Sequence, residues 1–334
     1  MTVVSGTLQT YDRVGNREDL EDVVYNISPK DTPLVSMIGS VPVSAVRHDW
    51  QTDTLRAPAA NAQVEGDDYA FQQKSPTVRV QNFTQIARDT LIVSASQEKA
   101  DKAGRKSELG YQLAKMGAEI KKDVELSLVS NTASSAGSST TGRVSAGFPA
   151  WITSATSTNG LRGATGTSGG FNSGTGLVAA AGNGTQRAFT KTLLDTAIST
   201  CYAAGGNPTT VMVSPYNKRV FSTFMSDSNV AQQRSAANGK KTAIVAAADM
   251  YLSDFGELAV VPNRVMLDAA ASRNVLVIDP DFVARGVFRA MSTEKLAKTG
   301  DAEKRAVVTE FCLVMKNEQA CTVIADTFGL TAST

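Results

Sequence analysis

Histidine and cysteine are scarce in this sequence, and both shortages exclude common kinds of functional site. His48 is the single histidine among 334 residues, so the chain offers no metal site with two histidine ligands and no second imidazole for a catalytic pair. The three cysteines, Cys201, Cys312 and Cys321, are too few and too scattered for a disulfide framework. We expect reduced, buried thiols in a cytoplasmic product.

The sequence also lacks an excess of either charge and any long apolar run. Lysine plus arginine number 33 and aspartate plus glutamate 32, which leaves a net charge of +1. A protein that wraps nucleic acid phosphates normally carries a large basic excess, so we expect any contact with DNA to be weak. No window approaches the roughly 20 apolar residues that cross a bilayer, and the first ten residues lack the features of a secretion signal. The sequence therefore predicts no membrane partner.

Motifs for catalysis or cofactor binding are missing as well. A serine or cysteine nucleophile would need His48 as its base, and the surrounding stretch "RHDWQTDTL" contains no nucleophile motif. We expect His48 to have a structural role beside Asp49 and Trp50. The stretch "GTGLVA" (174–179) formally fits a dinucleotide-binding pattern, but its flanks predict neither the preceding strand nor the following helix. The sequence thus predicts no catalytic, cofactor-binding or metal-binding residues.

Two pairs of aspartates are the remaining candidates for a cation site. Asp279 and Asp281, in "VIDPDF", could hold a divalent cation at a strand end, but aspartate beside proline is first of all turn chemistry. Asp67 and Asp68 lie in a turn-rich stretch, where we expect a solvated charge pair.

Residues 94–132 show one uninterrupted helical pattern. Such a helix of about 39 residues would be ~58 Å long at 1.5 Å per residue, yet only a narrow apolar stripe runs along it. Gly104, Gly110 and Gly117 each weaken it by about 1 kcal/mol relative to alanine. We expect a spine helix laid across a sheet, with its early, glycine-spaced part exposed or bent, rather than a coiled coil. The stripe consists of Leu109, Leu113, Met116, Ile120, Val124 and Leu128.

The segments before this helix favour an extended arm and a ribbon. Residues 1–45 carry three basic and six acidic side chains, a net charge of −3, and 17–27 ("REDLEDVVYNI") has apolar residues at helical spacing. The prolines of "SPKDTPL" (28–34) end that helix. The pattern over 76–93 is that of a strand with a bulge or kink, preceded by a turn-rich tip. We predict that 46–93 forms a long two-stranded ribbon.

Residues 131–188 contain twelve glycines, three arginines and no acidic residue. This composition predicts no ordinary core of its own. It leaves two alternatives, a flexible insert or a set of loops and short strands pinned by neighbours. "RVSAGFPAWI" (143–152) is the one part with enough aromatic residues to be anchored.

The last third of the chain becomes regular again. We predict a helix over 190–206, a strand over 209–215, and a helix that begins at Pro215 with Ser214 as its cap. Further strands up to about Arg289 complete a compact block, 189–293. Residues 304–327 are predicted to form a long hairpin that turns at "KNEQ", with Cys312 and Cys321 on its two strands.

The order of these pieces resembles a tailed-bacteriophage major capsid protein of the Hong Kong ninety-seven type. Three stretches carry the resemblance, "REDLEDVVYNISPKDTPL" (17–34), "HDWQTDTLRAPAANAQVEG" (48–66) and "TEFCLVMKNEQACTVI" (309–324). The resemblance implies an α+β fold with an N-terminal arm (1–45), an extended β-ribbon loop (46–93), a peripheral domain with the spine helix and the insert (94–188), an axial domain (189–293) and closing strands of the peripheral domain (294–334).

The resemblance also implies a function and partners. It implies a structural protein, not an enzyme, that assembles as hexamers and pentamers into an icosahedral phage head around double-stranded DNA, in the host bacterial cytoplasm. A portal protein, a decoration protein and a separate scaffolding chain are the further partners implied. Some members of the family crosslink a loop lysine to an asparagine of a neighbour; Lys74 and Asn317 are the candidates here, but no motif supports the assignment. We expect non-covalent shells.

Two other functions compete with this one. A tail or surface-fibre protein could place β-rich repeats in the glycine-rich middle, but 131–188 shows no fixed period. An enzyme with a mobile lid at 131–188 would need a base and a nucleophile, which the sequence does not offer together.

Overall fold

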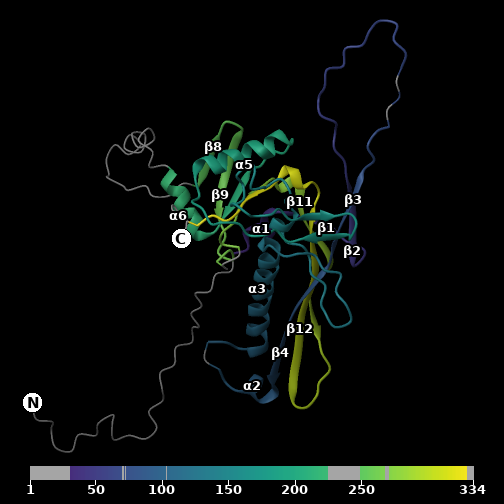
Figure 1. Ribbon diagram of the computed structural model, residues 1–334. Helices are drawn as coiled ribbons and strands as arrows, with labels where there is room; N and C mark the ends of the chain where they lie inside the picture. Colours follow the sequence, from purple (N-terminus) through teal and green to yellow (C-terminus); the bar gives the residue numbers. More distant parts are fainter. Residues whose placement is uncertain are drawn as a thin grey trace, which may run out of the picture.

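The computed structural model describes residues 31–69, 71, 73–102, 104–224, 249–267 and 271–328. The arm helix predicted at 17–27 lies outside these residues. The described part contains two main sheets, a long spine helix and one loop that projects far from the rest (Figure 1). No helix in these ranges is both long and apolar enough to span a bilayer.

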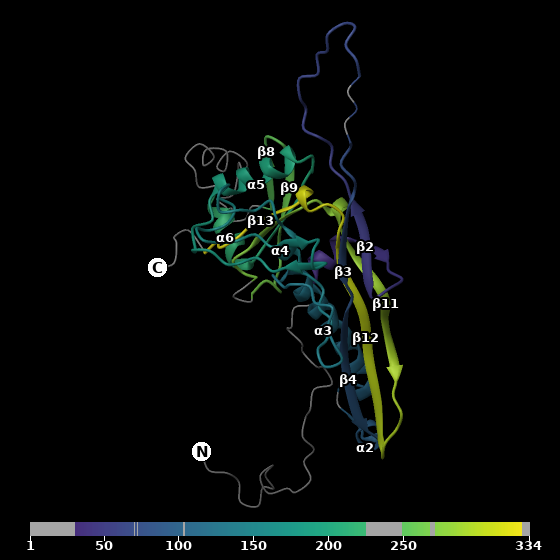
Figure 2. The ribbon, with the colours of Figure 1, turned by 45° about the vertical axis from the view of Figure 1, so that its right-hand side comes forward.

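The first sheet is long and narrow, and the spine helix runs along it. Its strand order is β1-β11-β12-β4, with β1 parallel to β11 and the other neighbours antiparallel. The spine helix α3 contacts β4 and β12, and both views show it beside these strands (Figures 1 and 2). The strands are β1 (Gly39–Pro42), β4 (Gln85–Ser94), β11 (Val283–Lys295) and β12 (Ala302–Met315).

The second sheet is more compact, in the order β13-β10-β7-β9-β8. The helix α5 (Lys191–Ala203) contacts β13, and α6 (Pro215–Thr223) contacts β7 and β9. Thr190 and Ser214 accept the N-terminal amides of these helices with their side chains, which confirms both helices and the predicted Ser214 cap. The strands are β7 (Thr210–Val213), β8 (Met250–Ser253), β9 (Gly256–Pro262), β10 (Val275–Ile278) and β13 (Thr322–Ile324).

The prediction of one uninterrupted helix over 94–132 is wrong. The chain forms a short helix α2 (Ala95–Lys99), breaks, and starts again as α3 (Glu108–Val129). The break is stable because Glu98 Oε2 accepts the first amides of α3, from Glu108 at 3.0 Å and Leu109 at 3.2 Å. The expectation that the early part of the spine is bent is confirmed. The stripe from Met116 to Leu128 is buried.

The extended ribbon is real but shorter than predicted. Only its base is a ladder, between β2 (Arg47–Thr52) and β3 (Val78–Phe83), and 53–77 has no regular structure where it is described. The predicted kink is confirmed at Thr84, which separates β3 from β4. After Thr84 the chain leaves the ribbon, because β4 pairs with β12 in the first sheet.

Residues 131–188 are packed into the body, so the alternative of loops and short strands pinned by neighbours is confirmed. The helix α4 (Phe148–Trp151) is fully buried, and β5 (Gly170–Asn172) pairs with β6 (Leu177–Ala179). Glycine allows this close packing, since a Cβ at Gly147 would lie 1.8 Å from the carbonyl oxygen of Ser130. The segment has no separate core: its Phe148, Ala150 and Ile152 belong to the hydrophobic core formed with the neighbouring elements.

The predicted hairpin over 304–327 is wrong. The strand β12 pairs with β11 and β4, whereas β13 pairs with β10 in the other sheet. Residues 316–321, with the 3-10 turn η4 (Glu318–Ala320), therefore carry the chain from one sheet to the other. Both strands are buried along much of their length. A buried apolar strand can pair with a strand of either sheet, so the apolar pattern alone could not show that β13 pairs with β10 rather than with β12.

Candidate functional site

The single histidine has a structural place in the ribbon base. His48 lies on β2, and its ring centroid is 5.6 Å from that of Trp50. Partial burial lowers the pKa of His48, while the charge of Asp49 opposes this shift. Asp49 is paired with Arg47 at 3.1 Å and with Arg79. These contacts agree with the structural role expected for His48 beside Asp49 and Trp50.

The first aspartate pair forms a turn, and the second lies in the extended loop. Asp279 accepts backbone amides from Asn207 at 3.0 Å and from Asp281 at 3.1 Å, as its predicted turn chemistry requires. Asp67 and Asp68 are exposed in the loop tip. Among the described residues, no three histidine, cysteine or acidic side chains are grouped closely enough to hold a metal ion.

The three thiols are buried and free, as predicted. Burial raises the pKa of Cys201 and of Cys312 to about 12, and it also raises that of Cys321. Thiols of this kind are mostly protonated at neutral pH and therefore unreactive. Cys312 and Cys321 do not face each other on paired strands, because β12 and the segment leading into β13 belong to different sheets.

The tip of the extended loop exposes several large apolar side chains to solvent. The loop projects beyond the body in both views (Figures 1 and 2). Burying one such side chain gains roughly 1.5–3 kcal/mol, so several of them together in water indicate a surface made for contact. The exposed fractions are 98% for Leu55, 78% for Val64, 86% for Tyr69 and 96% for Phe71.

The base of the loop, in contrast, is held firmly by the body. Trp50 donates from Nε1 to the carbonyl of Met315 at 2.9 Å, and its ring centroid is 5.4 Å from that of Trp151. The buried amide of Asn82 donates to the carbonyl of Leu313 at 2.7 Å and accepts from the amide of Ala146 at 3.1 Å. The ribbon base therefore joins the loop to the insert and to β12, and it fixes the point at which the loop leaves the body.

A buried carboxylate completes this attachment at the kink. Glu310, on β12, is 3% exposed and accepts from the Thr84 hydroxyl at 2.7 Å. Two arginines pair with it, Arg143 at 2.6 Å and Arg289 at 3.2 Å. Arg143 also donates from Nε to the carbonyl of Thr84 at 3.2 Å. This cluster thus connects the insert, the sheet and the residue at which the chain turns from loop to sheet.

A second buried carboxylate joins the arm to the spine helix. Glu125, on α3, is fully buried and accepts the amides of Leu34 and Val35, each at 2.8 Å. These amides begin the short helix α1 (Pro33–Met37). The side chain of Asn263, after β9, donates to the same carboxylate at 2.7 Å. One side chain therefore holds together the arm, the spine helix and the five-stranded sheet.

The stability of the subunit should fall as pH rises because of Glu125. Burial raises its pKa above the ordinary 4.5, and its three hydrogen bonds only partly oppose this shift. Between 4.5 and the raised pKa, the folded state holds a proton that the unfolded state has lost, so the free energy of unfolding decreases by up to about 1.4 kcal/mol per pH unit. Chemical denaturation at several pH values in that window should show that the free energy of unfolding decreases less with pH for Glu125→Gln than for the natural chain. Equal slopes would contradict this role.

Sequence reasoning missed Glu310, Glu125 and Asn82. A signal for Glu310 was present, since it is the only charge in the apolar run "AVVTEFCLVM" (306–315). Glu125 sits beside Val124 of the apolar stripe, but its partners are about ninety and 138 residues away in sequence. Of the two crosslink candidates, Lys74 is exposed in the loop tip, and Asn317 accepts the amide of Gln319 at 3.1 Å at the start of η4.

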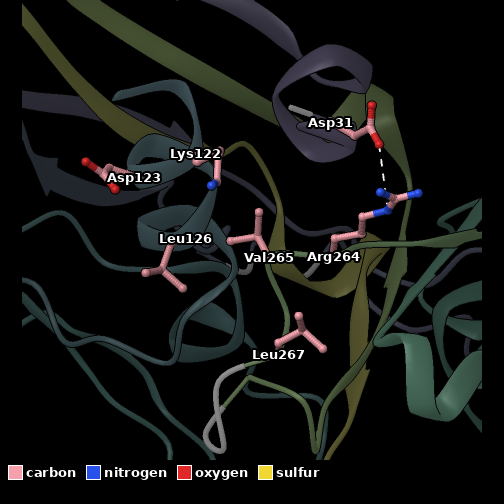
Figure 3. A pocket seen from close by; sticks show the side chains of 7 residues that line it. All are labelled: Asp31, Lys122, Asp123, Leu126, Arg264, Val265 and Leu267. Atoms are coloured by element: carbon pink, nitrogen blue, oxygen red, sulfur yellow. Dashed lines mark ion pairs between the residues drawn. The ribbon is translucent and has the colours of Figure 1, made fainter. Parts of the chain in front are cut away.

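A hollow beside the start of the described chain has a volume of about 360 Å³. Leu126, Val265 and Leu267 form its apolar lining, and Asp31 and Arg264 face each other at 3.8 Å (Figure 3). Lys122 and Asp123, both on α3, complete the lining. Asp31, the first described residue, therefore lies on this side of the spine helix.

Comparison with known proteins agrees with the resemblance of the sequence. A curated major capsid protein of Escherichia phage Phieco32 is 39% identical over 125 residues, which are 37% of this chain and 36% of that relative. A structure from Gordonia phage Cozz aligns with a TM-score of 0.61 at 14% identity, over 98% of this chain and 97% of the other. The capsid of a native GTA particle gives a TM-score of 0.60 at 10% identity, over 96% and 98%.

These structural likenesses show the Hong Kong ninety-seven type fold, as predicted. The match to a family covers nearly the whole length, from residue 4 to residue 328. This chain therefore belongs to the family of the SU10 major capsid protein.

Proposed function

We propose that this chain is the major subunit of a phage head and assembles with copies of itself into a closed icosahedral shell of hexamers and pentamers around double-stranded DNA. The exposed apolar tip of the extended loop is the observation that carries the proposal. Leu55, Val64, Tyr69 and Phe71 are exposed on the loop and would be buried by contact with another molecule, while hydrogen bonds of the base fix where the loop leaves the body. Family membership supports the same role.

The division into domains is part of this proposal. We propose that 1–45 is an arm and 46–93 a loop, both reaching neighbouring subunits. Residues 94–188 and 294–334 supply the peripheral domain, and 189–293 supply the axial domain that surrounds the symmetry axes. The five-stranded sheet supports a separate axial unit, to which β13 adds one strand from the C-terminal segment. The end of the predicted block departs from it, because β11 (Val283–Lys295) lies in the four-stranded sheet beside β12.

We also propose the remaining partners and the location. The near-neutral net charge supports weak contact with the packaged DNA. A portal protein, a scaffolding chain and a decoration protein are the expected further partners. The subunit would assemble in the host bacterial cytoplasm and remain in the virion.

Electron microscopy of the purified chain tests the proposed function. Closed shells are the expected result. Rods or fibres would favour the tail or surface-fibre alternative, and small discrete particles in every condition that supports assembly would contradict the proposal.

The shells are expected to be non-covalent. Denaturing gels of mature particles should show only the monomer of ~35 kDa. Lys74→Ala should then leave the gel pattern unchanged. A ladder of multimers that disappears in Lys74→Ala would instead identify Lys74 as a crosslinking residue.

A further inference from the structure

A small groove between the spine helix and the first sheet carries charge of only one sign. Its volume is about 200 Å³, and α1, α3, β11 and β12 contribute its walls. Among the described residues that line it, Lys121 on α3 and Arg285 on β11 are basic and none is acidic. Val124 and Phe311, both buried, form part of its apolar lining. The groove therefore combines an apolar surface with a cation on each of two walls.

Neither cation is neutralised within the part of the chain that the structure describes. The ion pairs in this part do not include Lys121 or Arg285. Arg285 Nε is moreover buried and has no hydrogen-bond acceptor there. A buried N–H group without an acceptor has lost its hydration and gained no bond in return, so binding of an anion beside it is favourable. Lys121 is exposed and adds a second positive charge to the same groove.

The hollow of Figure 3 lies on the other side of the spine helix and provides a comparison. It uses residues 122, 123 and 126 of α3, whereas the groove uses 121 and 124, and at about 100° per residue these are roughly opposite faces. Lys122 and Asp123 line the hollow together with the facing pair of Asp31 and Arg264, so acids and cations are equal in number there. Of these two sites, only the groove therefore favours a negatively charged ligand.

The size and chemistry of the groove favour a small carboxylate. Pockets for drug-sized molecules measure roughly 300–1,000 Å³, and this groove is smaller. Val124, Val287 and Phe311 favour a hydrocarbon part, because burial of apolar surface removes it from water. The guanidinium of Arg285 favours a carboxylate, which an arginine can hold with two parallel N–H donors. A short hydrocarbon chain that ends in a carboxylate meets both requirements.

We propose that this groove binds a small organic anion, a carboxylate with a short hydrocarbon chain. The carboxylate pairs with Arg285 and Lys121, and the chain lies against Val124, Val287 and Phe311. Since four elements line the groove, the bound anion joins α1 and the spine helix to the sheet and stabilises the folded subunit. This inference goes beyond the proposed function and does not depend on it, because a separate subunit contains the whole groove.

Calorimetric titration of unassembled, full-length subunits with hexanoate tests the class of ligand. Hexanoate should bind saturably and about tenfold or more tightly than hexylammonium, which has a similar chain and the opposite charge. Along the series butanoate, pentanoate and hexanoate, each further CH₂ that is buried should strengthen binding about fourfold. Absence of saturable binding, equal binding of hexylammonium, or an affinity independent of chain length would overturn the proposal.

Substitutions show whether hexanoate binds in this groove. Arg285→Gln should weaken binding about tenfold or more, and Lys121→Gln, at an exposed position, by up to about fivefold. K122Q/R264Q is the matched control, since it removes two cations from the hollow of Figure 3, and it should leave binding unchanged. Unchanged binding in Arg285→Gln, or equal weakening in the control, would overturn the proposal. If Arg285→Gln does not fold, Lys121→Glu replaces it, and unchanged binding in that variant would likewise overturn the site.

Discussion

Y69D/F71D is expected to abolish shell formation and to leave the subunit folded. The two side chains are almost fully exposed, so the subunit loses no internal packing when they change. In a shell, each would gain roughly 1.5–3 kcal/mol by burial on a neighbour, which corresponds to about 10²–10⁴ in the contact constant for the pair. Sedimentation velocity should show free subunits or small capsomers, and thermal unfolding of the subunit should be unchanged within about 0.5 kcal/mol.

Q63D/Q73D is the matched control for that variant. It adds the same two negative charges to exposed positions of the same loop tip but removes no apolar side chain. It should therefore assemble almost as well as the natural chain. Normal shells from Y69D/F71D would contradict the role of the apolar tip, and equal loss of assembly in both variants would show that charge alone is responsible.

Glu310→Ala is expected to lower the free energy of unfolding by about 3 kcal/mol. The change leaves Arg143 and Arg289 without their shared carboxylate and the Thr84 hydroxyl without its acceptor. Removing one partner of a buried ion pair typically costs about 3–5 kcal/mol, and the lower end applies because the side chain of Arg289 is about half exposed. Chemical denaturation of unassembled subunits measures this loss directly.

A pair on the surface provides the comparison for Glu310. Glu119 pairs with Lys115 at 3.6 Å on an open face of α3, and its removal as Glu119→Ala should change stability by less than about 0.5 kcal/mol. A similar small effect for Glu310→Ala would contradict the importance of the buried cluster. Glu310→Ala should also reduce assembly, since the cluster holds Thr84, from which the loop is directed.

Local signals in the sequence predicted those parts of the fold that local interactions determine. The caps at Thr190 and Ser214 lie three residues from the amides they accept, and the helix from Pro215 was predicted with Ser214 as its cap. The kink between β3 and β4 was likewise visible as an offset in the alternation of apolar residues. The apolar stripe of the spine was predicted correctly where it packs against the sheet.

The errors concern contacts between distant residues. Glu98 ends the predicted spine helix early by accepting amides ten and eleven residues away, an interaction that favourable helical spacing could not reveal. The short strand β13 pairs with β10 and not with β12, although the apolar pattern of three residues would be compatible with either sheet. The insert is packed because its glycines allow backbone to touch backbone, whereas composition alone indicates only that it has few apolar side chains.

The exposed apolar tip of the loop was predictable in outline only. The turn-rich stretch between the strands of the ribbon predicted a projecting tip, and the structure adds that Tyr69 and Phe71 are exposed on it. The carboxylates that fix the arm and the loop base were not predictable, since each takes its partners from segments far apart in sequence.

Amide hydrogen exchange at residues 53–77 tests most directly whether the subunit is completed by its copies. We expect fast exchange at the tip in unassembled subunits and exchange slower by about tenfold or more in shells. The buried strand β7 should be protected in both states and serves as the internal reference. Equal exchange at the tip in both states, or protection of the tip already present in the separate subunit, would contradict the account.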